Sequence, residues 1–112
     1  MKLSKRDEAD LRRHQDHLTV IGGGNRKQVR FVLDTAKPGL VRSLRALTRV
    51  VENQNAMPEE MRRKHPKKIS KMVSPRVAHR NAAAEKVVKG QRGGMLFSTI
   101  ARVGVPLIAG LF

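Results

Sequence analysis

The stretch Gly39-Leu-Val-Arg-Ser-Leu-Arg-Ala-Leu-Thr-Arg-Val-Val-Glu-Asn53 carries the clearest helical pattern of the chain and decides its fold. Its apolar side chains recur at intervals of three and four residues, which is the spacing of one face of an α-helix. They are Leu40, Leu44, Leu47 and Val51, widened by Val41 and Val50. We expect this face to form the centre of the core.

Helix signals surround this stretch on both sides. Asn25 and Gln28 have the spacing of a capping box, and Pro38 can end one helix and open the next. Pro58 and Ser74-Pro75 are start signals for two further helices. No segment alternates cleanly enough for a strand. The sequence therefore predicts an all-α fold, a small bundle of four to six short helices with an apolar C-terminal tail helix.

The 112 residues allow one domain at most, and we divide it into three segments. Residues 1–24 form a mobile or weakly docked N-terminal helix with a Gly hinge, because the apolar stripe from Ser4 to Val20 is thin. Residues 25–92 form a basic helical body. Residues 93–112 form an apolar C-terminal tail.

The formal net charge of +15 is the strongest indication of function, and it favours a polyanionic partner. Of the 24 Lys and Arg residues, 23 precede Gly93. Lysine and arginine neutralise phosphates without reading sequence, so we expect sequence-independent binding of duplex DNA. The absence of Trp and Tyr argues against single-strand readers that stack bases on aromatic side chains.

The candidate nucleic-acid-binding residues lie mainly in the second half of the basic body. Three arginines of the central helix are second choices, and ordinary surface arginines are an equally good interpretation of them. The candidates are Arg42, Arg45, Arg49, Arg62, Arg63, Lys64, Lys67, Lys68, Lys71, Arg76, Arg80, Lys86, Lys89 and Arg92.

Catalytic and metal sites are not indicated. The chain has no Cys, no paired carboxylates and no Ser-His-Asp arrangement, so we expect neither an enzyme nor a cofactor. Asp10, His14 and His17 share one helical face, but no fourth ligand is evident and a solvated surface explains them better. No apolar signal segment follows the basic N-terminus, so we expect an intracellular protein that is not secreted.

The apolar tail allows three interpretations: docking on a partner, packing in the core, or binding at a membrane surface. Its length approaches that of a transmembrane helix, but Arg102 near the middle makes insertion costly. We favour docking on a partner, and we expect DNA binding to survive deletion of residues 94–112. The candidate partner or membrane contacts are Met95, Leu96, Phe97, Ile100, Val103, Leu107 and Ile108.

One stretch resembles a known family. Gln91-Arg92-Gly93-Gly94-Met95-Leu96, after a basic helix and before a tail containing Pro106-Leu107-Ile108, resembles the C-terminal region of the adenovirus minor core protein precursor (mu, or X). It is more similar still to the small basic proteins of Polinton and adintovirus elements. The resemblance covers residues 29–112, with Met95 where Phe is usual and Arg102 in a tail that usually has no charge.

The resemblance implies a virion core protein that condenses the genome, located in the virion and the host nucleus, with capsid protein or membrane as the partner of its tail. It also implies processing by a viral cysteine protease, whose recognition pattern is a large apolar residue, any residue, Gly-Gly and then any residue, with the cut after Gly-Gly. Ile21-Gly22-Gly23-Gly24 fits, so we predict cleavage between Gly24 and Asn25 in an exposed hinge; a plain Gly linker is the alternative.

Two other functions remain open. One is a membrane-active basic protein with an interfacial C-terminal helix, in which the body binds anionic lipid. The other is a small basic protein of an RNA assembly of the ribosomal type. Preference for folded RNA over duplex DNA would favour the second.

Overall fold

The computed structural model describes residues 4–73, 80–90 and 95–110. The all-α prediction is confirmed, because the described part of the chain consists of helices and has no strand. The helices outnumber the expected four to six. They are α1 (Lys5–Arg13), α2 (Gln15–Gly23), α3 (Arg26–Asp34), α4 (Pro38–Asn53), α5 (Glu59–Lys64), α6 (Pro66–Val73), α7 (Arg80–Gly90) and α8 (Met95–Ala109).

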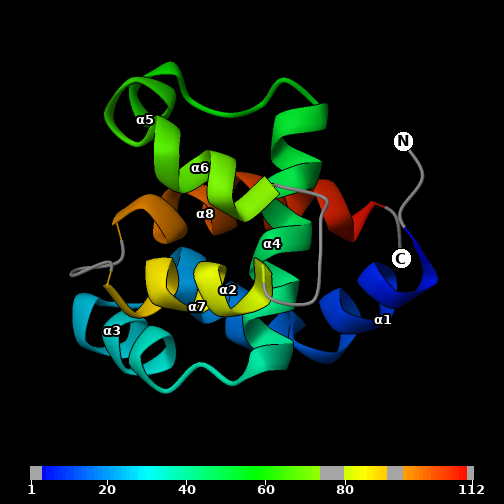
Figure 1. The fold of residues 1–112 in the computed structure, drawn as a ribbon. Coiled ribbons are helices and arrows are strands. Elements are labelled where there is room, and N and C mark those ends of the chain that lie inside the picture. The colour runs from blue at the N-terminus through cyan, green and yellow to red at the C-terminus, as the bar shows by residue number, and fades with distance from the viewer. Residues whose placement is uncertain (1–3, 74–79, 91–94, 111–112) are drawn as a thin grey trace.

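Helix α4 is the centre of the bundle, as its pattern predicts. It begins with Pro38 in its first turn and packs against α1, α6, α7 and α8 (Figure 1). Its apolar face is fully or almost fully buried. Each buried Leu or Val side chain contributes about 1.5–3 kcal/mol, so this one face is a major source of stability. The buried set comprises Leu40, Val41, Leu44, Ala46, Leu47, Val50 and Val51.

Local capping signals set several helix boundaries where they were predicted. Asn25 Oδ1 accepts a hydrogen bond from the Gln28 N–H, and Gln28 Oε1 accepts one from the Asn25 N–H, both at 2.9 Å. This reciprocal pair satisfies two amides at the start of α3. Ser4 Oγ caps α1 by accepting from the Asp7 N–H at 3.0 Å. The predicted start at Ser74-Pro75 lies outside the described residues.

The C-terminal helix α8 is a core helix, and this corrects the expectation that its side chains meet a partner or a lipid. Leu96, Phe97, Ile100 and Ile108 are 0 % exposed, and they belong to the same core as α4. The physical reason is that α2 and α4 both cover α8, so its apolar side is already occupied within the chain.

The remaining tail candidates are less enclosed. Val103 and Leu107 are partly buried against the core, and the side chain of Met95 lies outside the described residues. Within the described ranges, no helix has both the length and the apolar character needed to cross a membrane.

A close contact between α4 and α8 explains why α8 tolerates Gly104. A Cβ at this position would lie 2.6 Å from Leu47 Cδ1 and 3.1 Å from Val51 Cγ2. Only glycine therefore allows the two helices to approach this closely. The glycine that weakens α8 as an isolated helix improves its packing, and α8 continues through Pro106 to Ala109.

The N-terminal segment packs more firmly than its thin apolar stripe indicates. Leu11, Leu18 and Ile21 are 0 % exposed, so the expectation of a mobile or weakly docked helix is corrected. These few apolar residues suffice because all three are completely covered. Side chains from all three expected segments thus contribute to one core.

Candidate nucleic-acid interface

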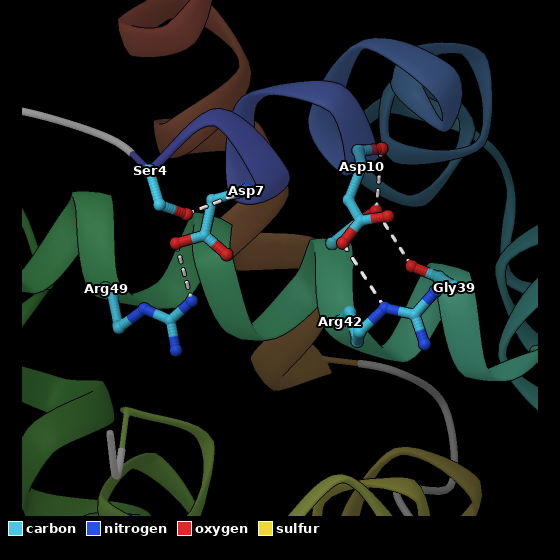
Figure 2. A network of polar contacts seen from close by, with 7 residues as sticks. Ser4, Asp7, Asp10, Gly39, Arg42 and Arg49 are labelled. Atoms are coloured by element: carbon cyan, nitrogen blue, oxygen red, sulfur yellow. Dashed lines mark hydrogen bonds and ion pairs between the residues drawn. The ribbon is translucent and has the colours of Figure 1, made fainter. Parts of the chain in front are cut away.

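The predicted phosphate-binding residues divide into two groups, and the first group lies on α4. Arg42 Nε lies 3.3 Å from Asp10 Oδ2, and Arg49 Nη2 lies 2.9 Å from Asp7 Oδ2 (Figure 2). Both pairs join α4 to α1. Arg45 lies between these two arginines in the sequence, and its side chain is half-buried. Arg42 and Arg49 thus hold two helices together, which leaves them less open to a phosphate than an unpaired surface arginine would be.

A buried hydrogen bond strengthens the same contact between α1 and α4. Ser43 Oγ donates to the backbone carbonyl of Asp10 at 2.8 Å, and Ser43 is 0 % exposed. Ser43 Oγ also lies 3.0 Å from the carbonyl of Gly39, one turn earlier on α4. The polar atoms that α1 brings to α4 are therefore satisfied within the chain.

The second group of basic residues lies on α5 and the helices after it. Helix α5 has Glu59 and Glu60 in its first turn and Arg62, Arg63 and Lys64 in its last turn. Acids at the start and bases at the end both stabilise a helix through its dipole. The three basic side chains are exposed, as are those of Lys67, Lys71, Lys86 and Lys89.

Some of these exposed bases already form ion pairs with carboxylates. Arg62 Nε lies 3.3 Å from Glu52 Oε1, Lys64 Nζ lies 2.7 Å from Glu60 Oε1, and Lys89 Nζ lies 2.9 Å from Glu85 Oε1. Exposed pairs of this kind contribute about 0–1 kcal/mol, so a polyanion can compete for the cations.

A groove between α6 and α7 gathers three lysines in its wall. Lys68 and Lys71 come from α6, and Lys86 comes from α7. The groove has a volume of about 580 Å³, and none of the described residues that line it carries a carboxylate. The remaining lining is small or apolar: Ala82, Ala83, Val87 and Gly90.

The sequence of α6 explains why its lysines face this groove. Ile69 and Met72 are buried, and helix α6 packs on α4. Lys68 and Lys71, each one position earlier, lie beside this buried face, where Lys68 is half-buried and Lys71 is exposed. Lys68 and Lys71 are three residues apart and are therefore neighbours on the helix surface. Helix α7 buries Ala84 and Val88 and leaves Lys86 exposed opposite them.

His65 reports the positive charge at the junction of α5 and α6. Its pKa is lowered from the usual value of 6.5, first by partial burial and then by the charges of Lys68 and Lys64. An imidazole next to two ammonium groups resists taking up a proton. A bound phosphate chain would oppose the smaller part of this pKa shift, which the lysines cause, and would leave the effect of burial in place.

Several of the predicted residues cannot be placed in the interface. Arg76 and Arg92 lie outside the described residues, and Arg80 is placed in α7 without a described side chain. The first four residues of the stretch that carries the family resemblance, Gln91–Gly94, also lie outside them. For metal binding, no group of three or more potential ligands occurs in the described ranges, which include Asp10, His14 and His17.

The predicted cleavage point is not an exposed hinge. Gly22 and Gly23 belong to α2, Gly24 ends that helix, and Asn25 caps α3. Ile21 is 0 % exposed. The capping box and the buried Ile21 hold this junction, so a protease that needs an extended segment can reach Gly24 and Asn25 only after α2 and α3 open locally.

One exposed apolar side chain was missed in the sequence. Phe31 is 69 % exposed on α3, next to a mainly apolar cavity of about 490 Å³ that His14, His17 and Leu40 also line. The sequence contains a signal for this exposure, because Phe31 lies two positions from each of the buried residues Val29 and Leu33. Two residues along a helix correspond to about 200°, which turns Phe31 away from the core.

Comparison of the chain with known protein families, curated proteins and solved structures found no match.

Proposed function

We propose that this protein binds the phosphate backbone of nucleic acid, with duplex DNA as its partner, through the basic surface of α5, α6 and α7. The observation that carries the proposal is the groove between α6 and α7. Its described lining includes Lys68, Lys71 and Lys86 and contains no carboxylate. Lysine ammonium groups bind phosphates as point charges and release the counterions condensed on DNA.

The surroundings of the groove support the same chemistry. Arg63 and Lys67 are exposed on the adjoining helices, and Lys64 and Lys89 sit in weak ion pairs that a phosphate chain can displace. The low pKa of His65 is consistent with a positive potential at the end of α5. The net charge of +15 adds a long-range attraction to any polyanion.

In this proposal the protein binds nucleic acid without recognising its base sequence. The groove offers ammonium groups, alanines and a valine, none of which forms the bidentate contacts that distinguish base pairs. We therefore propose a packaging role, as a virion core protein that condenses a DNA genome and acts in the virion and the host nucleus. The resemblance at residues 91–96 supports this setting, and proteolysis at Gly24 remains part of it.

Binding of the full-length chain to a short duplex across a salt series tests this proposal. We expect the logarithm of affinity to fall steeply and linearly with the logarithm of salt concentration, by about 0.9 for each phosphate neutralised. Folded RNA and vesicles containing anionic lipid are the comparison ligands. Weak duplex binding at low salt would overturn the proposal, and tighter binding to RNA or to vesicles would replace it with one of the other two functions.

A further inference from the structure

We propose a second phosphate-binding site, formed by Arg26, Ser98 and Arg102, which takes a backbone phosphate of a second nucleic-acid segment. Arg26 is the first residue of α3, while Ser98 and Arg102 lie one turn apart on α8. All three line a cavity of about 470 Å³ beside Glu60 and Met61 of α5. This inference rests on the proposed function and extends it from binding one duplex to bridging two.

Arg102 is the central residue of this site. It is the only charged residue between Gly93 and Phe112, and it is exposed on a helix that is otherwise largely buried. Its Nε lies 3.4 Å from the carbonyl oxygen of Gly22, to which it donates. This contact holds the guanidinium at the mouth of the cavity, next to Gly24 and Arg26.

The charge balance at the cavity is positive. Neither Arg26 nor Arg102 forms an ion pair with a carboxylate within the described ranges. Glu60 lines the cavity, but it accepts a hydrogen bond from Lys64 Nζ at 2.7 Å, and that bond together with the charge of Lys64 lowers the pKa of Glu60. Lys64 offsets the charge of Glu60, which leaves two guanidinium groups without a counterion.

The remaining chemistry of the cavity suits a phosphate. A guanidinium group presents two parallel N–H donors that match two oxygens of a phosphate. The Ser98 hydroxyl adds a neutral donor in the first turn of α8, where the helix dipole also favours an anion. Two arginines and a hydroxyl on one cavity give three separate donors for a single phosphodiester.

Among the described residues, this site and the lysine groove share no lining residue. The groove is lined by α6 and α7, whereas the cavity is lined by Gly24, the first half of α3, α5 and α8. A single duplex held in the groove therefore leaves the arginines available to another segment. Bridging of two segments by one small protein is the elementary step of condensation.

The test uses the full-length chain and two duplexes, one labelled with a donor dye and the other with an acceptor. The variant is Arg26→Gln with Arg102→Gln. The matched control is Arg13→Gln with Arg30→Gln, which removes the same charge from exposed positions of α1 and α3 that do not line the cavity. Binding to one duplex and energy transfer between two duplexes are both measured, and circular dichroism establishes that each variant is folded.

We expect the cavity variant to lose bridging by on the order of tenfold or more relative to the control, because charge-assisted contacts to phosphate are the strong ones. Its binding to a single duplex should match the control. Equal bridging by the two variants would overturn the second site and would not affect the proposed role of the lysine groove. Failure of the unmodified protein to bind any duplex would overturn the proposed function itself.

A second measurement does not depend on any variant folding. Arginines of the unmodified protein are modified with phenylglyoxal in the presence and absence of excess duplex, and the products are located by mass spectrometry. We expect protection of Arg26 and Arg102 and unchanged reaction of Arg13 and Arg30. Equal reactivity of all four arginines with and without duplex would overturn the site.

Discussion

The carboxylate of Asp10 lies 3.3 Å from Nε of Arg42, and this ion pair joins α1 to α4 across 32 positions of sequence. The Asp10 side chain is 10 % exposed and that of Arg42 is 38 % exposed. The pair therefore has a structural role, and it removes Arg42 from the set of cations offered to a ligand. The lysines of α6 and α7 are therefore the cations that we propose for binding phosphate.

We predict that Arg42→Gln destabilises the fold and leaves DNA binding almost unchanged. Because Asp10 is nearly buried while Arg42 is partly open to water, we expect a loss of about 1–2 kcal/mol, between the values of exposed and buried pairs. Urea denaturation measures the stability, and Arg30→Gln on the exposed side of α3 is the control. A change in the salt dependence of DNA binding without a change in stability would contradict this role.

Deletion of residues 94–112 should prevent folding. Leu96, Phe97, Ile100 and Ile108 are 0 % exposed, and each side chain of this size contributes about 1.5–3 kcal/mol when buried. Their sum is comparable to the whole stability of a small domain, about 5–15 kcal/mol. The measurement is thermal unfolding followed by circular dichroism, and a cooperative transition in the truncated chain would refute the core placement of α8.

Gly104→Ala should destabilise the protein by about 1–3 kcal/mol, the usual cost of overpacking a core. The added methyl would lie 2.6 Å from Leu47 Cδ1 and 2.7 Å from Leu47 Cγ, and Leu47 is completely buried. Gly23→Ala is the matched control, because nothing lies within 4 Å of its Cβ position. The control should be neutral or stabilising by up to about 1 kcal/mol. Equal behaviour of the two variants in urea denaturation would contradict the close contact.

Stability should fall as the pH is lowered from 7 to 5, and His14 should account for part of the loss. Burial first and His17 second lower the pKa of His14 below the usual 6.5, while Asp10 acts in the opposite sense. The unfolded chain then binds the proton more tightly, so the stability present above pH 6.5 is lost as the pH falls through the folded value.

Unfolding at a series of pH values, with His14→Gln as the variant, measures this effect. His65 has a pKa lowered in the same direction and adds to the loss. An unmodified protein whose stability is flat from pH 7 to 5, or a variant with an undiminished loss, would show that His14 stays solvated.

Local patterns in the sequence predict much of the fold. The spacing of Leu40, Leu44 and Leu47 predicts the central helix, and the pair Asn25 and Gln28 predicts the start of α3. Both signals involve residues within a few positions of one another. The apolar pattern of α8 is equally compatible with a core and with a docking surface, so only the arrangement of α2 and α4 around it decides between them.

The sequence predicts which basic residues can form the candidate site, but it does not predict where in the fold they meet. Lys68 and Lys71 are neighbours on one helix, but their meeting with Lys86 depends on how α6 packs against α7. In the same way, Arg49 resembles a surface arginine until the fold brings Asp7, 42 positions earlier, within 2.9 Å. Pairings over such distances leave no pattern in a single sequence.

The most direct test of the account removes the three lysines of the groove. The variant combines Lys68→Gln, Lys71→Gln and Lys86→Gln, and the control combines Arg6→Gln, Arg13→Gln and Arg30→Gln, with equal loss of charge from exposed positions of α1 and α3. Duplex binding is measured between about 50 and 200 mM salt, where counterion release dominates the change in affinity.

We expect the lysine variant to lose about 2–3 from the magnitude of the salt slope, close to 0.9 for each phosphate contact removed, while the control keeps the slope of the unmodified protein. If both variants lose the same amount, the protein attracts DNA through its net charge alone, and the groove between α6 and α7 is not the binding site.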